Sequence, residues 1–275
     1  EVEYDVGDYQ AVAQRLTSLA QETDAILLVP PDQVEAVGQT YDGHSTPYLM
    51  PQEVPLEPED TARKLEEMVS RHPNIFAIFR EEQGVDPDQF IEGWLNRHTY
   101  RGPTEWYGGV RLVMFGASTA GISDSFDDSG EMEHPLDIEL GERIRLLGYT
   151  LAEESVEPGR IVRLTLFWRA NAPLSERYAV FAHVLDEEGQ LVAQQDGEPV
   201  GGSRPTSTWS AGDVVADRVG ILMPVDVAKG PYRLMVGMYR PDTGERLPVL
   251  DKNGNAVDAP PAEGNSITLG TILVE

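Results

Sequence analysis

From about Leu136 to its end, the chain consists of short β-rich runs separated by turn signals. The runs recur at about the 8–12-residue spacing that is typical of β-sandwiches. Strands are expected at 138–140, 144–151, 161–170, 178–186, 190–195, 214–223, 232–239, 246–250 and 267–274. Positions 162, 164, 166 and 168 are apolar and share one face at period two. We therefore predict an antiparallel β-sandwich over residues 136–275, either Ig-like or jelly-roll-like.

The first half alternates helical and strand patterns. Helices are expected at 9–22, 32–39, 59–72 and 86–96, and strands at 24–29, 74–80 and 110–115, with a short one at 48–50. Alternation of this kind favours a small three-layer α/β domain with a mostly parallel sheet, here over residues 1–117. No GxGxxG or GKS/T pattern follows any of these strands, so a nucleotide-binding loop is not predicted.

Residues 118–135 separate the two patterns. This stretch is small, polar and acidic, which is typical of an interdomain linker. Its acidic cluster includes Asp124, Asp127 and Asp128, which are the calcium candidates of this chain. Their spacing does not fit an EF-hand loop, and a solvated linker is the alternative interpretation.

Charge and composition exclude several classes of partner. The formal net charge is −26, so phosphate backbones and anionic lipid surfaces are repelled, and nucleic acid is not an expected partner. The charge is otherwise interpreted as a source of solubility. Cysteine is absent, and no window approaches the roughly 18 apolar residues of a membrane helix. The acidic start at Glu1, without a signal peptide, suits a mature or excised fragment.

No motif for catalysis, metal binding or a cofactor emerges from the sequence. The five histidines have no HxxxH or HExxH spacing, and no serine lies in a GxSxG elbow. We therefore expect no catalytic residue, no metal centre and no cofactor in this chain.

Four residues of the second half are candidates for ligand binding. Trp209 lies in a Ser/Thr/Gly/Pro-rich loop, where it either stacks on a sugar ring or anchors the loop in the sandwich edge. Asp217 and Arg218 are neighbours on one strand, so their side chains point to opposite faces. Each serves either in a structural ion pair or turn cap, or in ligand binding. Tyr178 is a packing residue or a ligand contact.

Several short motifs of the second half are familiar as a group. They are LLGY at 146–149, EPG at 157–159, PTSTWSAGD at 205–213, DR at 217–218, GPYRL at 230–234, VGMY at 236–239 and TGERL at 243–247. Together they resemble a β-sandwich module at the C-terminus of bacterial polytopic membrane glycosyltransferases of the protein-mannosyltransferase type. The run at 24–27 resembles the extracytoplasmic α/β segment that follows the last membrane helix in such proteins. The resemblance implies that catalysis on a polyprenyl-phosphate sugar resides in a membrane part that this sequence does not contain.

The first functional hypothesis is therefore a non-catalytic extracytoplasmic region of a membrane glycosyltransferase-like protein, which positions or recognises a glycan or protein acceptor. The first alternative is a free secreted carbohydrate-binding protein. The second alternative is an enzyme whose site lies at the strand ends of the α/β half, around Asp32, His44 and Glu81.

Overall fold

The structure of the chain is a computed structural model that describes residues 6–80, 85–86, 88–117, 132–251, 253–257 and 261–275. The chain forms two compact units, Glu1–Ser123 and Asp124–Glu275. The calcium candidates Asp124, Asp127 and Asp128 lie outside the described residues. No helix in the described part of the chain combines the length and the apolar character needed to cross a bilayer.

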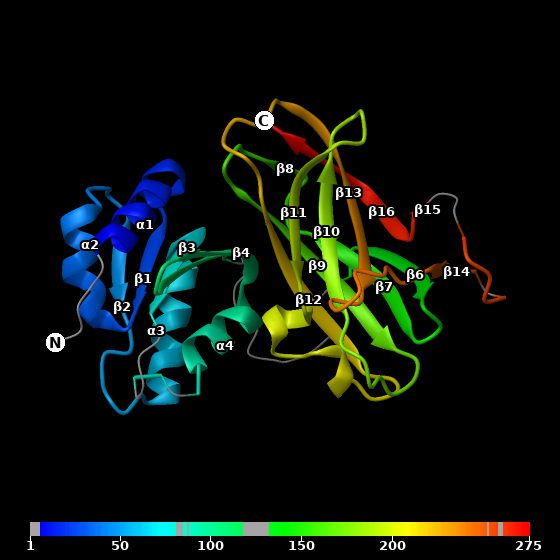
Figure 1. The fold of residues 1–275 in the computed structure, drawn as a ribbon, viewed down its shortest axis with the longest axis horizontal. Coiled ribbons are helices and arrows are strands. Elements are labelled where there is room, and N and C mark those ends of the chain that lie inside the picture. The colour runs from blue at the N-terminus through cyan, green and yellow to red at the C-terminus, as the bar shows by residue number, and fades with distance from the viewer. Residues whose placement is uncertain (1–5, 81–84, 87, 118–131, 252, 258–260) are drawn as a thin grey trace. The chain divides into compact units, whose positions relative to one another are not determined.

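The first unit is an α/β domain, which confirms the predicted fold class (Figure 1). Its helices are α1 (Val6–Leu19), α2 (Val34–Thr40), α3 (Pro58–Arg71) and α4 (Phe90–His98), with a 3₁₀ turn, η1, at Pro31–Gln33. Its strands are β1 (Ala25–Val29), β2 (Thr46–Leu49), β3 (Asn74–Arg80), β4 (Tyr100–Tyr107) and β5 (Val110–Gly116). Helix α4 begins four residues later than expected, because the Asp86 carboxylate caps it by accepting the N–H groups of Phe90 and Ile91.

The sheet of this unit has the strand order β4-β5-β3-β1-β2. The pairs β1–β2 and β1–β3 are parallel, whereas β3–β5 and β4–β5 are antiparallel, so the sheet is mixed. Strand β1 is buried along its whole length, and β3 is buried up to its last residue, which requires cover on both faces. Helices α3 and α4 pack on one face, while α1 and α2 lie on the other (Figure 1).

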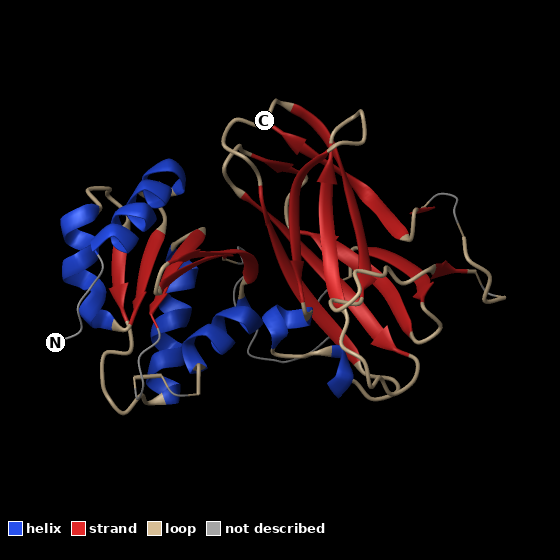
Figure 2. Cartoon of the chain, viewed as in Figure 1, coloured by secondary structure: helices blue, strands red, loops and turns tan. Residues whose placement is uncertain are grey.

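The second unit is an antiparallel β-sandwich, as predicted, and Figure 2 shows that strands make up nearly all of its regular structure. One sheet has the order β14-β6-β7-β9-β12 and the other β11-β10-β13-β16-β15, with β8 parallel to β16. The first sheet contains β6 (His134–Leu140), β7 (Ile144–Leu151), β9 (Ile161–Ala170), β12 (Val214–Leu222) and β14 (Val249–Leu250). The second contains β10 (Ala179–Leu185), β11 (Leu191–Gly197), β13 (Gly230–Tyr239), β15 (Ala262–Glu263) and β16 (Ser266–Val274), with β8 at Ser155–Val156.

One continuous core joins the two sheets of the sandwich. The period-two face of β9, from Leu164 through Leu166 to Trp168, meets Val180 of β10 and Val236 of β13 in this core. Full burial of each such side chain stabilises the folded state by roughly 1.5–3 kcal/mol. Two short 3₁₀ turns, η2 (Pro199–Gly202) and η3 (Thr206–Thr208), interrupt the long connection from β11 to β12.

Candidate functional site

A cavity of about 700 Å³ opens at one end of the second sheet of the sandwich. Three segments that are distant in sequence line it: residues 176, 177 and 179 at the start of β10, residues 197–198 at the end of β11, and residues 239–242 at the end of β13. The register explains why they meet, since Ala179 pairs with Tyr239 and Val180 pairs with Gly197. We call this cavity the β10–β13 pocket.

The rim of the β10–β13 pocket carries charges of both signs. Arg177 donates through Nε to Oε1 of Glu198 at 2.5 Å, and its Nη2 contacts the other carboxylate oxygen. Glu198 raises the pKa of Arg177, so that guanidinium stays charged throughout the physiological range. Glu176 accepts a hydrogen bond from the Tyr178 hydroxyl at 2.9 Å and lies 3.9 Å from Arg240. Arg177, Glu198, Glu176 and Arg240 are therefore each in contact with another polar group of this region.

Tyr239 supplies the aromatic side chain of the pocket. Its hydroxyl group is hydrogen-bonded to Asp196. Burial and the negative charge of that carboxylate both raise the pKa of Tyr239. Asp196 in turn lies 3.8 Å from Nε2 of His183. Burial raises the pKa of Asp196 and lowers that of His183, so it favours the neutral form of each group. These groups extend from the pocket along the outer face of β10 and β11.

The outer face of the same sheet carries a second aromatic side chain, Phe181, near Tyr239. Phe181 is buried there beneath Arg246, whose guanidinium lies 4.2 Å from the ring centroid. Gly237 faces Phe181 across the strands, and a Cβ at that position would lie 2.4 Å from the ring. Glycine is therefore required at 237 for the ring to lie flat against β13.

The β11–β12 connection contacts the segment of the pocket that precedes β10. The Thr206 hydroxyl donates to the carbonyl of Glu176 at 2.7 Å and accepts the N–H of Tyr178 at 2.9 Å. Thr206 is completely buried, so these bonds compete with no water. They fix the segment that carries Glu176 and Arg177.

Of the four residues that the sequence marked as ligand candidates, only Tyr178 lies beside the pocket lining. Trp209 is 2% exposed, packs in the sandwich core and donates its indole N–H to the carbonyl of Arg204 at 3.0 Å. Its ring faces are occupied by protein and are not presented to a ligand. Arg218 is half-buried on β12, on the strand face opposite to Asp217.

Asp217 is 3% exposed, and its carboxylate accepts the N–H of Val200 at 2.8 Å. Burial raises the pKa of Asp217 from 3.8 to about 6, although the Val200 bond, the Trp168 indole and the charge of Arg218 all oppose that rise. Asp217 thus lies beneath the β11–β12 connection rather than in the pocket.

Of the three residues that the enzyme hypothesis named in the first unit, the structure describes Asp32 and His44. Asp32 is held by Arg80 at 2.6 Å, His44 is exposed, and Glu81 lies outside the described residues. The buried Gln33, which follows Asp32 in the chain, donates to the carbonyl of Pro30 and accepts a hydrogen bond from the Tyr9 hydroxyl. In the described ranges no three His, Asp or Glu side chains gather in a way that would hold a metal ion.

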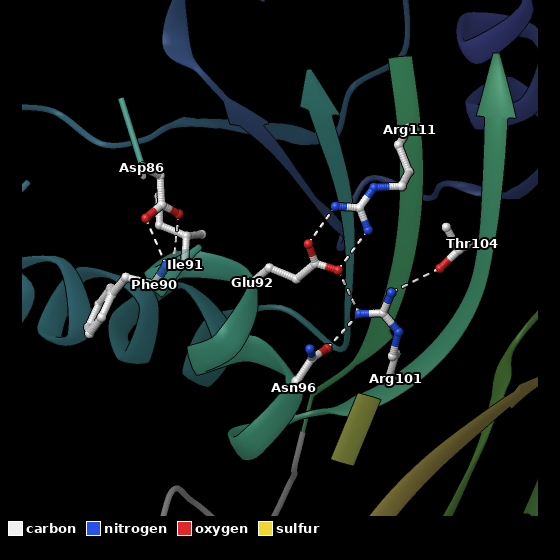
Figure 3. A network of polar contacts seen from close by, with 8 residues as sticks. All are labelled: Asp86, Phe90, Ile91, Glu92, Asn96, Arg101, Thr104 and Arg111. Carbon is white, nitrogen blue, oxygen red and sulfur yellow. Dashed lines mark hydrogen bonds and ion pairs between the residues drawn. The ribbon is translucent and has the colours of Figure 1, made fainter. Parts of the chain in front are cut away.

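A polar network in the first unit joins α4 to the β4–β5 hairpin (Figure 3). Glu92 of α4 accepts two bonds from Arg111, one of them at 2.7 Å, and a third from Arg101 at 2.9 Å. Arg101 also donates to Asn96 and Thr104. Burial raises the pKa of Glu92, but the two guanidinium groups outweigh it and hold the pKa below 4.5. The network is saturated within the unit, and we assign it a structural role.

Sequence reasoning missed the pocket residues Glu176, Arg177, Glu198, Tyr239 and Arg240. The available signal was indirect, since VGMY at 236–239 and TGERL at 243–247 already stood out as motifs. Nothing local, however, indicated that the end of this motif would face residues 176 and 198.

No protein-family model and no curated protein matches the sequence. Among solved structures, the C-terminal domain of wzt is 14% identical, with a TM-score of 0.34 over 55% of this chain and 87% of that chain. A Niemann-Pick type C2 protein from Japanese carpenter ant is 7% identical, with a TM-score of 0.28 over 53% of this chain and 98% of that chain. The CARDB domain of the PF1109 protein from Pyrococcus furiosus is 11% identical, with a TM-score of 0.25 over 50% of this chain and 96% of that chain. The likeness is remote, concerns β-sandwich architecture, and assigns neither a family nor a ligand.

Proposed function

We propose that the second unit recognises an uncharged glycan at the β10–β13 pocket, and that the chain is a non-catalytic extracytoplasmic region of a membrane glycosyltransferase-like protein. In that setting the pocket would hold a glycan, free or carried on a protein acceptor, near a catalytic part elsewhere in the same protein. The observation that carries the proposal is the composition of the pocket, a tyrosine accompanied by hydrogen-bond donors and acceptors of nearly balanced charge.

A sugar ring presents hydroxyl groups that both donate and accept, together with apolar C–H faces. In the pocket, the carboxylates of Glu176, Glu198 and Asp242 can accept hydrogen bonds, and the guanidinium groups of Arg177 and Arg240 can donate them. Three carboxylates against two guanidinium groups leave no large local charge. An uncharged polyol therefore suits this site better than a strong anion or cation. The chain's charge of −26 further disfavours an anionic ligand.

The ring of Tyr239 adds the apolar component that such ligands need. Aromatic side chains combine a large contact area with a polar tip, and here the Asp196 carboxylate fixes that tip. Cavities of about 300–1,000 Å³ with a few converging polar groups are the usual form of small-ligand sites. The volume of about 700 Å³ falls within this range.

Calorimetry tests the binding part of the proposal. The full chain is titrated with neutral oligosaccharides built from mannose, glucose or galactose, and with the same sugars oxidised to uronic acids. Binding of a neutral member is expected to weaken about tenfold or more in Tyr239→Ala and in Arg240→Ala, as for residues at the centre of a binding site. Arg233→Ala is the matched control, because Arg233 lies on the same strand but pairs with Glu263.

Two results would contradict this assignment. One is the absence of heat with every neutral sugar, and the other is binding that Tyr239→Ala and Arg240→Ala leave unchanged. Preference for the uronic acids would show that the charge argument is wrong.

The parent protein is tested separately through the gene. The motifs that resemble the C-terminal module of membrane mannosyltransferases support an origin in such a protein. The reading frame should then encode several long apolar segments ahead of Glu1. If it encodes none, a free carbohydrate-binding protein with the same pocket takes the place of the first hypothesis.

A further inference from the structure

The η2 turn has an unusual backbone for its sequence. Val200 has φ 56° and ψ 41°, and Gly201 has φ 60° and ψ 29°, so two successive residues are left-handed. Glycine adopts this conformation freely, but a β-branched side chain such as valine is strongly disfavoured in it. Val200 is nevertheless buried in the sandwich core. Something in the surrounding structure must hold the turn in this form.

Asp217 provides that restraint. Its Oδ1 accepts the N–H of Val200 at 2.8 Å from the neighbouring strand β12. Both residues are buried, so the bond is shielded from water, and a buried carboxylate is costly unless it makes such bonds. The backbone of Asp217 pairs with Leu166 of β9, in the regular part of the sheet. It is therefore a rigid point to which the turn is attached.

The turn determines where Glu198 lies. Glu198 directly precedes it, and the N–H of Gly202 donates back to the carbonyl of Glu198 at 3.1 Å. The Glu198 side chain then lines the β10–β13 pocket and accepts the bidentate contact from Arg177. A chain of contacts thus runs from Asp217 through Val200 to the wall of the pocket.

We infer that Asp217 is a positioning residue for the β10–β13 pocket: through the left-handed Val200 turn it holds Glu198 where it binds Arg177 and borders the ligand space. The inference deepens the proposed function and rests on it only in treating this pocket as a ligand site. It also gives a role to the Asp217 candidate, which touches no ligand itself.

The test uses the full chain, ¹⁵N-labelled, with two readouts. Exchange of the Gly202 amide reports the turn, and the chemical shift of the Arg177 Nε–H reports its contact with Glu198. Glu198→Gln defines the shift of an Arg177 that lacks its carboxylate partner. In Asp217→Leu, Gly202 exchange should accelerate at least about tenfold and the Arg177 signal should move most of the way to that value.

Two rescues and one control separate positioning from general destabilisation. Asp217→Asn keeps an oxygen acceptor and should preserve both readouts. Val200→Gly, introduced into Asp217→Leu, should restore the Arg177 signal, because glycine adopts the left-handed turn without a restraint. Asp213→Ala removes a similar carboxylate–backbone bond, to Ser210 at 2.9 Å, and should leave the Arg177 signal unchanged.

An unchanged Arg177 signal in Asp217→Leu would overturn the inference. If that variant does not fold, Asp217→Asn decides the matter: an Arg177 signal displaced to the Glu198→Gln value while the Gly202 amide stays protected would also overturn the inference. These readouts need no ligand. If every oligosaccharide in the panel fails to bind the wild type, the proposed function is wrong. The two NMR readouts would still show whether Asp217 sets the position of Glu198.

Discussion

Replacing Asp217 by asparagine removes one buried charge while it keeps an acceptor for the Val200 N–H. Asp217 is 3% exposed, and burial raises its pKa from 3.8 to about 6. One pKa unit is about 1.36 kcal/mol, so the full shift corresponds to roughly 3 kcal/mol of stability that depends on protonation.

The direction follows from which state binds the proton more tightly. The pKa of Asp217 is higher in the folded chain than in the unfolded one, so protonation favours folding. Its contribution is present in full below pH about 4 and is lost as the pH rises through about 6. Asparagine does not titrate. The unfolding free energy of Asp217→Asn, relative to wild type, should therefore increase by about 1.4 kcal/mol between pH 5 and pH 8.

Urea unfolding at a series of pH values measures this difference. Trp94 and Trp106 are replaced by phenylalanine in both proteins, so that fluorescence reports only Trp168 and Trp209 of the second unit. Asp226→Asn serves as the control, because it removes the same formal charge from an exposed position. Parallel stability curves for wild type and Asp217→Asn across this pH range would refute the buried-carboxylate argument.

Three further substitutions test the packing described above. Glu92→Gln should destabilise the first unit by about 2–3 kcal/mol at neutral pH, and the difference from wild type should shrink as the pH falls below 4.5. Glu66 is exposed, so Glu66→Gln should leave the stability of the unit almost unchanged. Circular dichroism during urea unfolding measures both variants. Trp209→Ala should lower the free energy of unfolding by about 3–5 kcal/mol, because the side chain is buried. Trp106 is 61% exposed, so Trp106→Ala should lower it by less than about 1 kcal/mol. Equal losses of stability in calorimetric unfolding would contradict the buried position of Trp209. Thr206→Val should cost about 1–3 kcal/mol and release the Tyr178 amide to hydrogen exchange, and continued protection of that amide would show that Thr206 does not hold the pocket wall.

The local pattern of the sequence was sufficient for most strands of the sandwich. Strand β9 runs from Ile161 to Ala170, as predicted, because a period-two apolar face and the preceding EPG turn are both properties of neighbouring residues. Strands β10 and β11 were predicted to within two residues at each end for the same reason. Helix α4 shows the limit of such signals, since Asp86 was taken as its start and instead caps it from outside.

Strand β4 was not predicted, and its absence made the sheet look mostly parallel. Its sequence, YRGPTEWY, contains a glycine, a proline and charged side chains that do not read as a strand. Its pairing depends on β5 and on the ion pairs of Glu92 with Arg101 and Arg111, which come from a separate helix. Only the folded unit brings these charges together.

The division between sequence and tertiary structure is sharpest at the β10–β13 pocket. The sequence by itself determined the two classes of fold, the absence of familiar catalytic motifs and the importance of the segments around Trp209 and Asp217. Only the tertiary structure decided that those two side chains are internal, and that Glu176, Glu198 and Tyr239 share one hollow. The physical reason is that apolar periodicity is a local property of the chain, whereas strand register between distant segments is set by the packing of the whole sandwich.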